Sequence, residues 1–315
     1  MTPRVSVVIP SYNNADYVEA TVRSVIEQTY DDFELLISDH SSTDGTWDLL
    51  QQFTSDPRVR LSQVPQGGGA PANWRAVTAL ASGELLKLVC ADDLLAPTAL
   101  QEQVAAMDAH PSAVLVSSLR NIVDADDRIV VRGRGLQGMD GLVPGDVARR
   151  RTVVVGSNVF GEPACSLVRT EALRLAGSWD DRSPYLLDQA TFSAVLRFGD
   201  LVALRRTLAT FRISHGQWSV ALAKEQAAHA RGFHRSIGAE QPGLLSRRDR
   251  WVGDVRATGM AVARRAVYQA LRLRRRPGVV RIAPDAHTQA APPTGTRPDP
   301  PDGARSNRST EPTGG

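Results

Sequence analysis

The sequence has little cysteine, little lysine and no long hydrophobic run. Its two cysteines, Cys90 and Cys165, lie far apart and without a Cys-x-x-Cys or Cys/His spacing, which argues against a structural zinc site and favours a reducing compartment. No stretch approaches the roughly 18 apolar residues that cross a bilayer. The apolar run at 5–9 is too short for a secretory signal and has no cleavage site after it. We therefore expect a cytoplasmic protein, either free or peripheral on the inner face of the cell membrane.

Common catalytic signatures are missing as well. The glycine run at 67–69 does not match Gly-x-Gly-x-x-Gly, and no lysine follows a glycine loop as it does in a P-loop. Neither Gly-x-Ser-x-Gly nor His-Glu-x-x-His occurs. The motifs therefore give no support to a dinucleotide-binding, P-loop, serine hydrolase or zinc protease function.

Positive charge is concentrated in one C-terminal segment. The whole chain has a net charge of +3, whereas residues 247–276 contain ten arginines against Asp249 and Asp254. The rest of the chain is therefore mildly acidic. Apolar residues among these arginines, such as Trp251 and Val255, fit either an amphipathic helix in peripheral contact with an anionic membrane or a packed and solvated helix. We expect no nucleic-acid partner.

Strand and helix patterns alternate over the first hundred residues, which is typical of a parallel α/β sheet. Apolar runs at 5–9, 33–37, 59–61 and 85–90 predict strands, and segments with helical spacing separate them. The pattern is mixed from 95 to 220: it predicts helices at 98–107, 170–176 and 187–198, strands at 113–117, 129–131, 164–168, 201–204 and 208–213, and a glycine-rich loop at 133–145. Residues 220–276 are predicted to be helical, with a break near Pro242 and Gly243.

Three polar clusters follow directly after predicted strands. They are Ser11–Asn14, Ser38–Thr46 and the pair Asp92 and Asp93. Ligands of open α/β sheets bind at the carboxyl ends of the strands. We therefore expect the three clusters to meet in one crevice.

The adjacent carboxylates Asp92 and Asp93 repel each other unless a positive group joins them. A divalent cation such as Mg²⁺ or Mn²⁺, with diphosphate oxygens completing its ligand shell, fits this pair. The alternative is an exposed helix start, where acids are favoured by the helix dipole. For Asp39, a contact to a nucleotide base competes with simple capping of the following helix, and we favour the base contact. For Ser42, Thr43 and Asp44 we favour capping.

These residues resemble the donor-site motifs of family 2 glycosyltransferases. The similar segments are Val5–Asn13, Ser38–Thr46 and Cys90–Asp93. The resemblance implies an α/β fold of the GT-A (Rossmann-like) type, a mixed sheet flanked by helices with a C-terminal helical extension. It implies a donor-binding half at 1–95 and an acceptor-binding half of the same domain at 96–220. A basic helical extension at 221–276 and a disordered tail at 277–315 complete the predicted organisation.

The resemblance also implies roles for individual residues. Asp188, in Tyr185–Phe192, corresponds to the catalytic base, and residues 161–166 to a loop that shapes the acceptor pocket. Arg212–Ser219 resembles the segment that closes the donor site. The donor is expected to contact Pro10, Ser11, Tyr12, Asn13, Asp39, Ala91 and Asp92, and Mg²⁺ or Mn²⁺ is expected at Asp92, Asp93 and His215. Two departures stand out, because Cys90 replaces the first acid of the metal-binding motif and His40 replaces the second acid of the base-binding motif.

The implied activity is inverting transfer of a sugar from a nucleotide-diphosphate sugar to an acceptor hydroxyl. The expected acceptor is a glycan or a lipid-linked molecule in cell-envelope or polysaccharide synthesis. Two alternatives are a non-catalytic nucleotide-sugar-binding protein of the same fold and a sugar-phosphate nucleotidyltransferase. The second would need a glycine- and basic-rich N-terminal loop, which Pro10–Asn13 does not provide.

Overall fold

A computed structural model describes residues 2–180, 182, 184–213 and 225–273. Within these residues, ten strands form one mixed sheet with the order β3-β2-β1-β4-β9-β6-β10-β5; β7 pairs with β6, and β8 with β10. The strands are β1 (Val5–Ser11), β2 (Phe33–Asp39), β3 (Val59–Gln63), β4 (Leu85–Leu88), β5 (Leu94–Leu95), β6 (Ala113–Val123), β7 (Ile129–Arg134), β8 (Gly141–Val143), β9 (Ser166–Arg169) and β10 (Asp200–Arg212). β1 is parallel to β2 and β4, β9 is antiparallel to β4 and β6, and β6 is parallel to β10. The strands β1, β2, β4, β6 and β10 therefore all end at the same edge.

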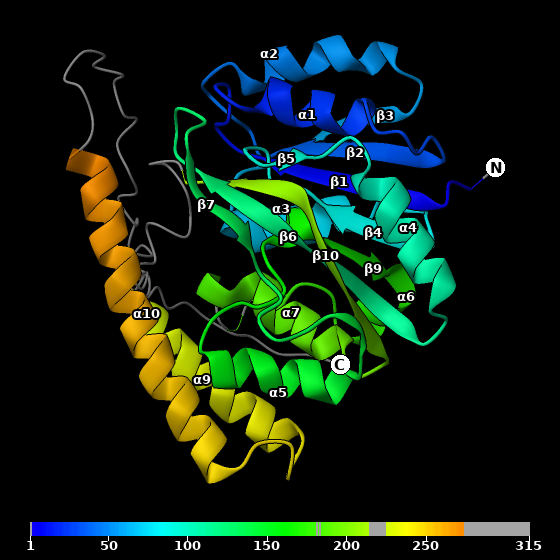
Figure 1. The fold of residues 1–315 in the computed structure, drawn as a ribbon. Coiled ribbons are helices and arrows are strands. Elements are labelled where there is room, and N and C mark those ends of the chain that lie inside the picture. The colour runs from blue at the N-terminus through cyan, green and yellow to red at the C-terminus, as the bar shows by residue number, and fades with distance from the viewer. Residues whose placement is uncertain (1, 181, 183, 214–224, 274–315) are drawn as a thin grey trace, which may run out of the picture. The chain divides into compact units, whose positions relative to one another are not determined.

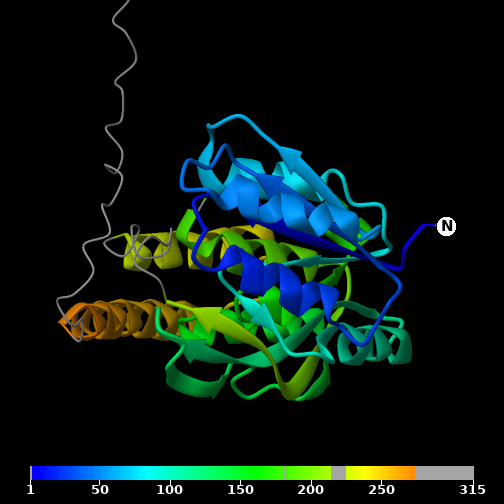
Figure 2. The ribbon, with the colours of Figure 1, turned by 90° about the horizontal axis from the view of Figure 1, so that it is seen from above.

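Helices cover both faces of the sheet (Figures 1 and 2). They are α1 (Val18–Ile26), α2 (Thr46–Gln51), α3 (Gly69–Thr78), α4 (Ala99–Ala109), α5 (Gly145–Val155), α6 (Thr170–Leu175) and α7 (Leu187–Val195). Alternate residues of β1 point to opposite faces: Val7 packs in one core with α1, α2 and α4, whereas Val8 packs in another with α3, α5, α6 and α7. Burial on both faces explains why β1 and β2 are buried along their whole length.

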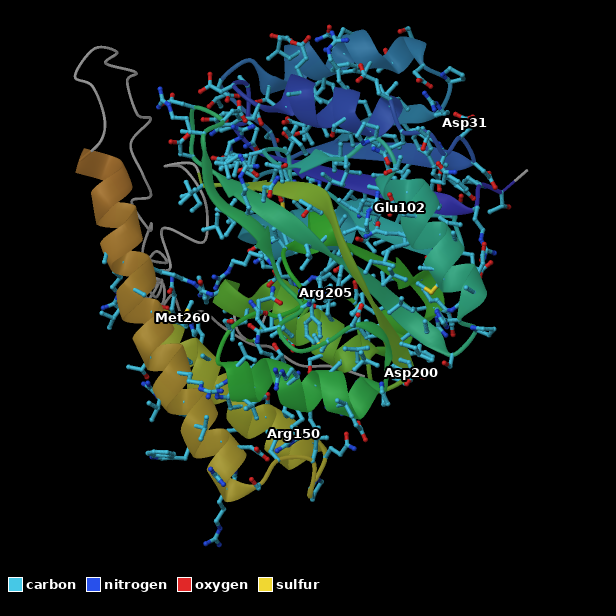
Figure 3. All side chains as sticks on the ribbon, in the orientation of Figure 1. Asp31, Glu102, Arg150, Asp200, Arg205 and Met260 are labelled. Carbon is cyan, nitrogen blue, oxygen red and sulfur yellow. The ribbon has the colours of Figure 1, made fainter. Side chains whose placement is uncertain are left out.

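Two further helices, α9 (Gln226–Glu240) and α10 (Arg247–Leu273), form the C-terminal extension. They close a third apolar cluster over α5 and α7, made of Val153, Leu186, Ala190, Phe233, Ile237 and Leu245. α10 packs closely on α5: a Cβ placed on Gly253 would lie 2.5 Å from the carbonyl oxygen of Val153. Arg150 of α5 reaches Asp249 of α10, with Nη2 2.7 Å from Oδ1 (Figure 3). Among the described residues, none of the helices is both long and apolar enough to cross a bilayer.

The predicted architecture, a mixed sheet flanked by helices with a helical extension, is confirmed. Three local predictions were wrong. The strands predicted at 201–204 and 208–213 form one strand, β10, which ends at Arg212, because bulges at 204–209 keep it paired with β6. β4 ends at Leu88 rather than at residue 90. The predicted loop at 133–145 contains β8, and α5 follows it unpredicted, because its arginines and β-branched valines obscure the helical period.

Candidate active site

The shared sheet edge brings the three predicted loops together. β1 ends at Ser11, β2 at Asp39, and the turn after β4 carries Asp92 and Asp93. The backbone N–H of His40 donates to the carbonyl of Ser11 at 2.9 Å, so the first two loops are joined as soon as their strands end. The structure thus places the sequence-predicted residues Pro10 to Asn13, Asp39, and Ala91 to Asp93 at one edge.

Side chains connect the first two loops further. The backbone N–H of Asn13 donates to Oγ of Ser42, and Oδ1 of Asn13 accepts from the backbone N–H of Thr43, both at 2.9 Å. Asn13 adopts the left-handed conformation (φ 50°), which asparagine tolerates better than most residues. Oγ1 of Thr46 accepts from the backbone N–H of Asn14 at 2.8 Å. These bonds join the first two loops instead of capping the following helix, since α2 has Gly45 as its N-cap and no side-chain capping hydrogen bond. Tyr12 is 44% exposed beside the edge.

Asp39 is fully buried and organises the second loop. Its carboxylate accepts hydrogen bonds from the backbone N–H of Ser42 (2.9 Å), from Oγ of Ser42 (2.5 Å) and from Nε2 of Gln63 (3.2 Å). An ionised carboxylate has about four acceptor sites. The three internal donors therefore fix the orientation of the group without using its full capacity.

Asp92 and Asp93 are both buried in the turn after β4. Oδ1 of Asp93 accepts from the backbone N–H of Arg212 at 3.2 Å, and Nε of Arg212 donates to the carbonyl of Asp92 at 3.1 Å. Oδ2 of Asp93 is buried without a hydrogen-bond partner. Burial, together with the charges of Asp92 and Glu162, raises the pKa of Asp93 well above its usual range. The fold therefore gathers acidic groups here, and it favours the protonated form of Asp93.

Arg212, at the end of β10, ties this turn to its surroundings. Its guanidinium lies 2.7 Å from Asp127 and 4.5 Å from the ring centre of Tyr17, a cation–π contact. Asp127 follows β6, so the arginine joins the ends of three strands. Residues 214–219 of the predicted donor-closing segment, including His215 as a predicted metal ligand, lie outside the described residues.

Asp188, the predicted base, lies in the first turn of α7 and is half-buried. Nδ2 of Asn158 donates to its Oδ2 at 2.9 Å, and the backbone N–H of Gln189 donates to its Oδ1 at 2.7 Å. Burial, and next the charge of Glu162, raise the pKa of Asp188 to about 7, although Arg120 and the Gln189 N–H act in the opposite direction. A carboxyl group with this pKa can accept a proton near neutral pH.

Glu162 and Arg120 form a buried ion pair between the aspartate pair, Asp92 and Asp93, and the predicted base Asp188. Nη2 of Arg120 donates to Oε1 of Glu162 at 2.9 Å, and Arg120 is only 3% exposed. The carboxylates of Asp93, Asp92, Asp188 and Glu162 all raise the pKa of the Cys90 thiol, after burial as the main cause. The predicted metal-binding pair and the predicted base therefore belong to one acidic cluster.

The residues at the edge fit a divalent cation. The orphaned Oδ2 of Asp93 and the mutual repulsion of the neighbouring carboxylates are the features that a hard cation would relieve. No group of three or more acidic, histidine or cysteine side chains in the described part of the chain forms a ready ligand set. Mg²⁺ is commonly held by one or two carboxylates plus substrate phosphates, so two aspartates suffice when a diphosphate completes the shell.

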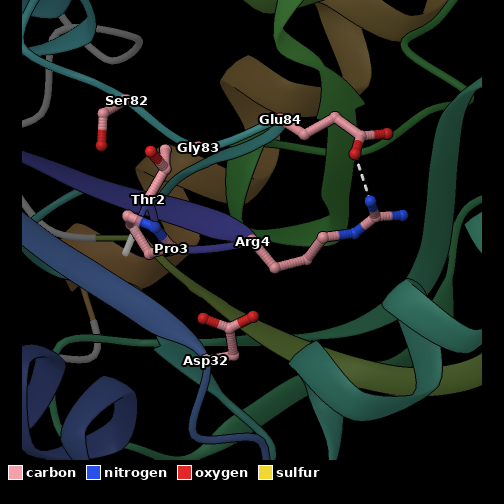
Figure 4. A pocket seen from close by; sticks show the side chains of 7 residues that line it. All are labelled: Thr2, Pro3, Arg4, Asp32, Ser82, Gly83 and Glu84. Carbon is pink, nitrogen blue, oxygen red and sulfur yellow. Dashed lines mark hydrogen bonds and ion pairs between the residues drawn. The ribbon is translucent and has the colours of Figure 1, made fainter.

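A surface hollow of about 440 Å³ lies at the opposite end of the parallel strands (Figure 4). It is lined by the residues that precede β1, β2 and β4: Thr2, Pro3, Arg4, Asp32, Ser82, Gly83 and Glu84. Arg4 and Glu84 form an ion pair across it. None of the sequence-predicted site residues contributes to this hollow.

Sequence reasoning missed Asn158, Arg120 and Asp127. Glu162 and Arg212 belonged to segments expected near the acceptor and the donor, but their partners were not predicted. Arg120 pairs with a residue 42 positions away, and Asn158 with one 30 positions away. No local motif signals such pairs.

Known proteins share both the sequence pattern and the fold. The family model described as Glycosyl transferase family 2 matches residues 6–174. A putative teichuronic acid biosynthesis glycosyltransferase of Bacillus subtilis, TuaG, is 37% identical over 103 residues, which are 32% of this chain and 41% of that protein. The UDP-Glc:alpha-D-GlcNAc-diphosphoundecaprenol beta-1,3-glucosyltransferase WfaP of Escherichia coli is 33% identical over 104 residues, 33% of this chain and 41% of that protein. The match thus spans less than half the length of either relative.

Two solved structures extend the likeness to three dimensions. Staphylococcus aureus TarS 1–349, in complex with UDP-GlcNAc, has a TM-score of 0.61 at 19% identity and covers 76% of this chain and 66% of that one. The mannosyltransferase PcManGT of Pyrobaculum calidifontis, in complex with GDP-Man and Mn²⁺, has a TM-score of 0.58 at 18% identity and covers 87% of this chain and 81% of that one. These structures confirm the predicted GT-A fold. Because the family model matches more than half of the chain, the protein belongs to glycosyltransferase family 2.

Proposed function

We propose that the protein is an inverting glycosyltransferase that moves a sugar from a nucleotide-diphosphate sugar to an acceptor hydroxyl. The carrying observation is that the two donor-side loops and the pair Asp92 and Asp93 lie at one edge of the sheet, and that the charge of Glu162 acts on both Asp93 and the half-buried Asp188. The relatives named for teichuronic acid synthesis and for a diphosphoundecaprenol acceptor support a role in cell-envelope or polysaccharide synthesis, with a glycan or lipid-linked acceptor.

The half at 1–95 would hold the donor. Tyr12 offers an exposed ring beside the edge, and the fixed carboxylate of Asp39 retains acceptor capacity for a base N–H. Pro10, Ser11, Asn13, Ala91 and Asp92 complete the proposed donor contacts. The two neighbours that were solved with UDP-GlcNAc and GDP-Man support a nucleotide-sugar donor.

Asp92 and Asp93 would hold Mg²⁺ or Mn²⁺, and His215 is proposed as a further ligand. The cation would stabilise the charge that develops on the leaving diphosphate. The Mn²⁺ complex of the mannosyltransferase neighbour supports this assignment. The protein itself contributes the fixed turn in which Arg212 orients both aspartates through the Asp92 carbonyl and the Asp93 carboxylate.

The half at 96–220 would bind the acceptor and activate it. Asp188 accepts the proton of the acceptor hydroxyl while the oxygen forms a bond to the anomeric carbon. The bond from that carbon to the diphosphate oxygen breaks on the opposite side, and its electron pair leaves with the diphosphate, so the configuration inverts. Asn158 and the N–H of Gln189 hold the carboxylate in position for this transfer.

The experiment is a screen of UDP, GDP and dTDP sugars for hydrolysis and transfer, with Mn²⁺ and with EDTA. Asp188→Asn should bind the active donor with wild-type affinity and lose about 10²- to 10⁴-fold in kcat. The exposed Asp48→Asn, on α2, serves as the matched control. Transfer that survives in Asp188→Asn, or a product of retained anomeric configuration by NMR, would contradict the mechanism.

A non-catalytic nucleotide-sugar-binding protein is the second candidate, because Cys90 stands where the family motif carries its first acid. Donor binding by calorimetry without turnover for any tested sugar would favour it. A sugar-phosphate nucleotidyltransferase has weaker support, since the loop after β1 carries neither a glycine run nor a basic residue.

A further inference from the structure

The outward side of α10 carries an exposed apolar stripe. Trp251, Val255 and Val262 are 68%, 54% and 62% exposed. Steps of four and seven residues keep all three side chains on one side of a helix with 3.6 residues per turn. The opposite side, which includes Ala257 and Ala261, is buried. The stripe therefore faces away from the fold that α10 packs against, at the margin of the molecule (Figure 3).

Arginines flank this stripe, while both acids of α10 have bonding partners within the protein. Arg247 and Arg248 are exposed one turn before Trp251, and Arg265 is exposed one turn after Val262. Asp249 is paired with Arg150, and its pKa is lowered to about 2 by that arginine as the first cause.

The second acid, Asp254, lies 2.7 Å from Nδ1 of His234 on α9. Seven arginines lie between Arg247 and Leu273, and Arg274, Arg275 and Arg276 follow in the sequence. In the described part of the helix, the outward side is therefore apolar along the stripe, with exposed arginines before it at 247 and 248 and after it at 265.

We propose that this side of α10 binds an anionic lipid bilayer. An indole and two valines can enter the headgroup boundary, while arginines on both flanks attract acidic lipid headgroups. A second copy of the chain is a poorer occupant, because a two-fold contact through the same face would place like-charged arginine rows against each other.

The attachment would also place the acceptor-side segment near the lipid. Arg264 of α10 donates to the hydroxyl of Tyr185, three residues before Asp188, and lies 5.8 Å from its ring centre. This consequence rests on the proposed function and agrees with a lipid-linked acceptor. The membrane contact itself does not require sugar transfer, so its test uses no activity readout.

The test is co-sedimentation of the full-length chain with phosphatidylcholine vesicles, with and without about 30% phosphatidylglycerol. We expect binding that needs the anionic lipid and weakens with salt. Trp251→Ser/Val255→Ser/Val262→Ser should lower the partition coefficient roughly tenfold or more. The matched control is Val147→Ser/Leu175→Ser/Phe198→Ser, which removes three exposed apolar side chains elsewhere and should bind as the wild type does.

The charge contribution is tested separately with Arg247→Gln/Arg248→Gln. Each removed charge should reduce binding about fivefold, since a basic residue near an anionic surface contributes about 1 kcal/mol. Brominated lipids should quench Trp fluorescence in the wild type and much less in Trp251→Phe, a readout that is independent of sedimentation. Equal binding to neutral vesicles, no binding, or wild-type binding by the Ser triple variant would overturn the proposal. The proposal would also be overturned if the wild type were a dimer, the Ser triple variant were a monomer, and neither protein bound vesicles.

Discussion

Replacing Asp188 by asparagine removes a carboxyl group whose ionisation the fold disfavours. Its pKa of about 7 in the folded protein compares with 3.8 for an unperturbed aspartate. Between these two values the folded chain binds more protons at this position than the unfolded chain does. The free energy of unfolding of the wild type therefore falls as the pH rises from 4 to 7, and the full penalty is present above 7.

The size of the effect follows from the two pKa values. The raised pKa of Asp188 lowers the free energy of unfolding by about 4 kcal/mol at pH 8 and by about 2 kcal/mol at pH 5. Asparagine carries no such penalty, but its amide cannot accept from both Asn158 and the Gln189 N–H. That loss does not depend on pH, so it cancels when the two pH values are compared. The stability of Asp188→Asn relative to the wild type should therefore rise by about 2 kcal/mol from pH 5 to pH 8.

Urea denaturation of both proteins at pH 5 and pH 8 measures this difference, and Asp48→Asn controls for the loss of one exposed charge. The same carboxyl group should produce an ascending limb in kcat/KM near pH 7, because the base must be ionised to accept a proton. A variant whose stability follows the wild type in parallel across this range would refute the reasoning. It would mean that Asp188 is ionised at no cost, and the pH limb would need another source.

Three further predictions follow from the same cluster and from the strand beneath it. Glu162→Gln should move the kcat/KM limb to lower pH, since the charge of Glu162 helps to raise the pKa of Asp188; an unmoved limb would exclude that coupling. Mn²⁺ at about 100 times its Kd should stabilise the wild type by about 2.7 kcal/mol. Asp93→Ala should lose most of this stabilisation, as measured by thermal denaturation. An equal Mn²⁺-induced shift in both proteins would show that Asp93 is not part of the metal site. Burial lowers the pKa of Lys87 to about 7, so the unfolded lysine binds more protons than the folded one between pH 7 and pH 10. Over this window the free energy of unfolding of the wild type should rise by roughly 3 kcal/mol relative to that of Lys87→Met. Denaturant curves without this rise would contradict a buried, largely neutral amine.

The donor side of the fold was predictable from sequence because its signals are local. Strands such as β1 and β2 are continuous apolar runs, and the polar residues that follow them mark the edge where ligands bind. Ser11, Asp39 and Asp93 could be assigned to one edge of the sheet without knowing any contact between them. The family resemblance added the roles, which the sequence pattern alone could not supply.

The acceptor side was less predictable because its contacts are long-range. The environment of Asp188 depends on Asn158, Glu162 and Arg120, which come from three separate segments. The helix α5 was missed for a related reason. Its arginines are partly buried by partners far along the chain, such as Gln241 for Arg149, so a polar residue in its sequence does not indicate an exposed position.

Three strands of the sheet each contribute one buried basic side chain near the acidic edge. Lys87 of β4 donates to the carbonyls of Ala164 and Ser166, at 2.7 and 3.1 Å, and so fixes the loop that carries Glu162. Arg120 of β6 binds the Glu162 carboxylate, and Arg212 of β10 binds the turn of the adjacent aspartates. Because strands are the most rigid elements available, these contacts set the positions of the acids before any ligand arrives.

Within the part of the chain that the structure describes, the same arrangement leaves the edge short of positive charge. Four carboxylates face two arginines, since burial favours the neutral form of Lys87. The excess of acidic over basic groups contributes to the raised pKa values of Asp93 and Asp188. A divalent cation at the aspartate pair would balance this charge and ease the ionisation of Asp188 at once. Metal binding at Asp92 and Asp93 and proton acceptance by Asp188 should therefore be coupled. Mn²⁺ should shift the ascending limb of the kcat/KM profile to lower pH. A limb at the same pH with and without Mn²⁺ would show that the aspartate pair and Asp188 act independently.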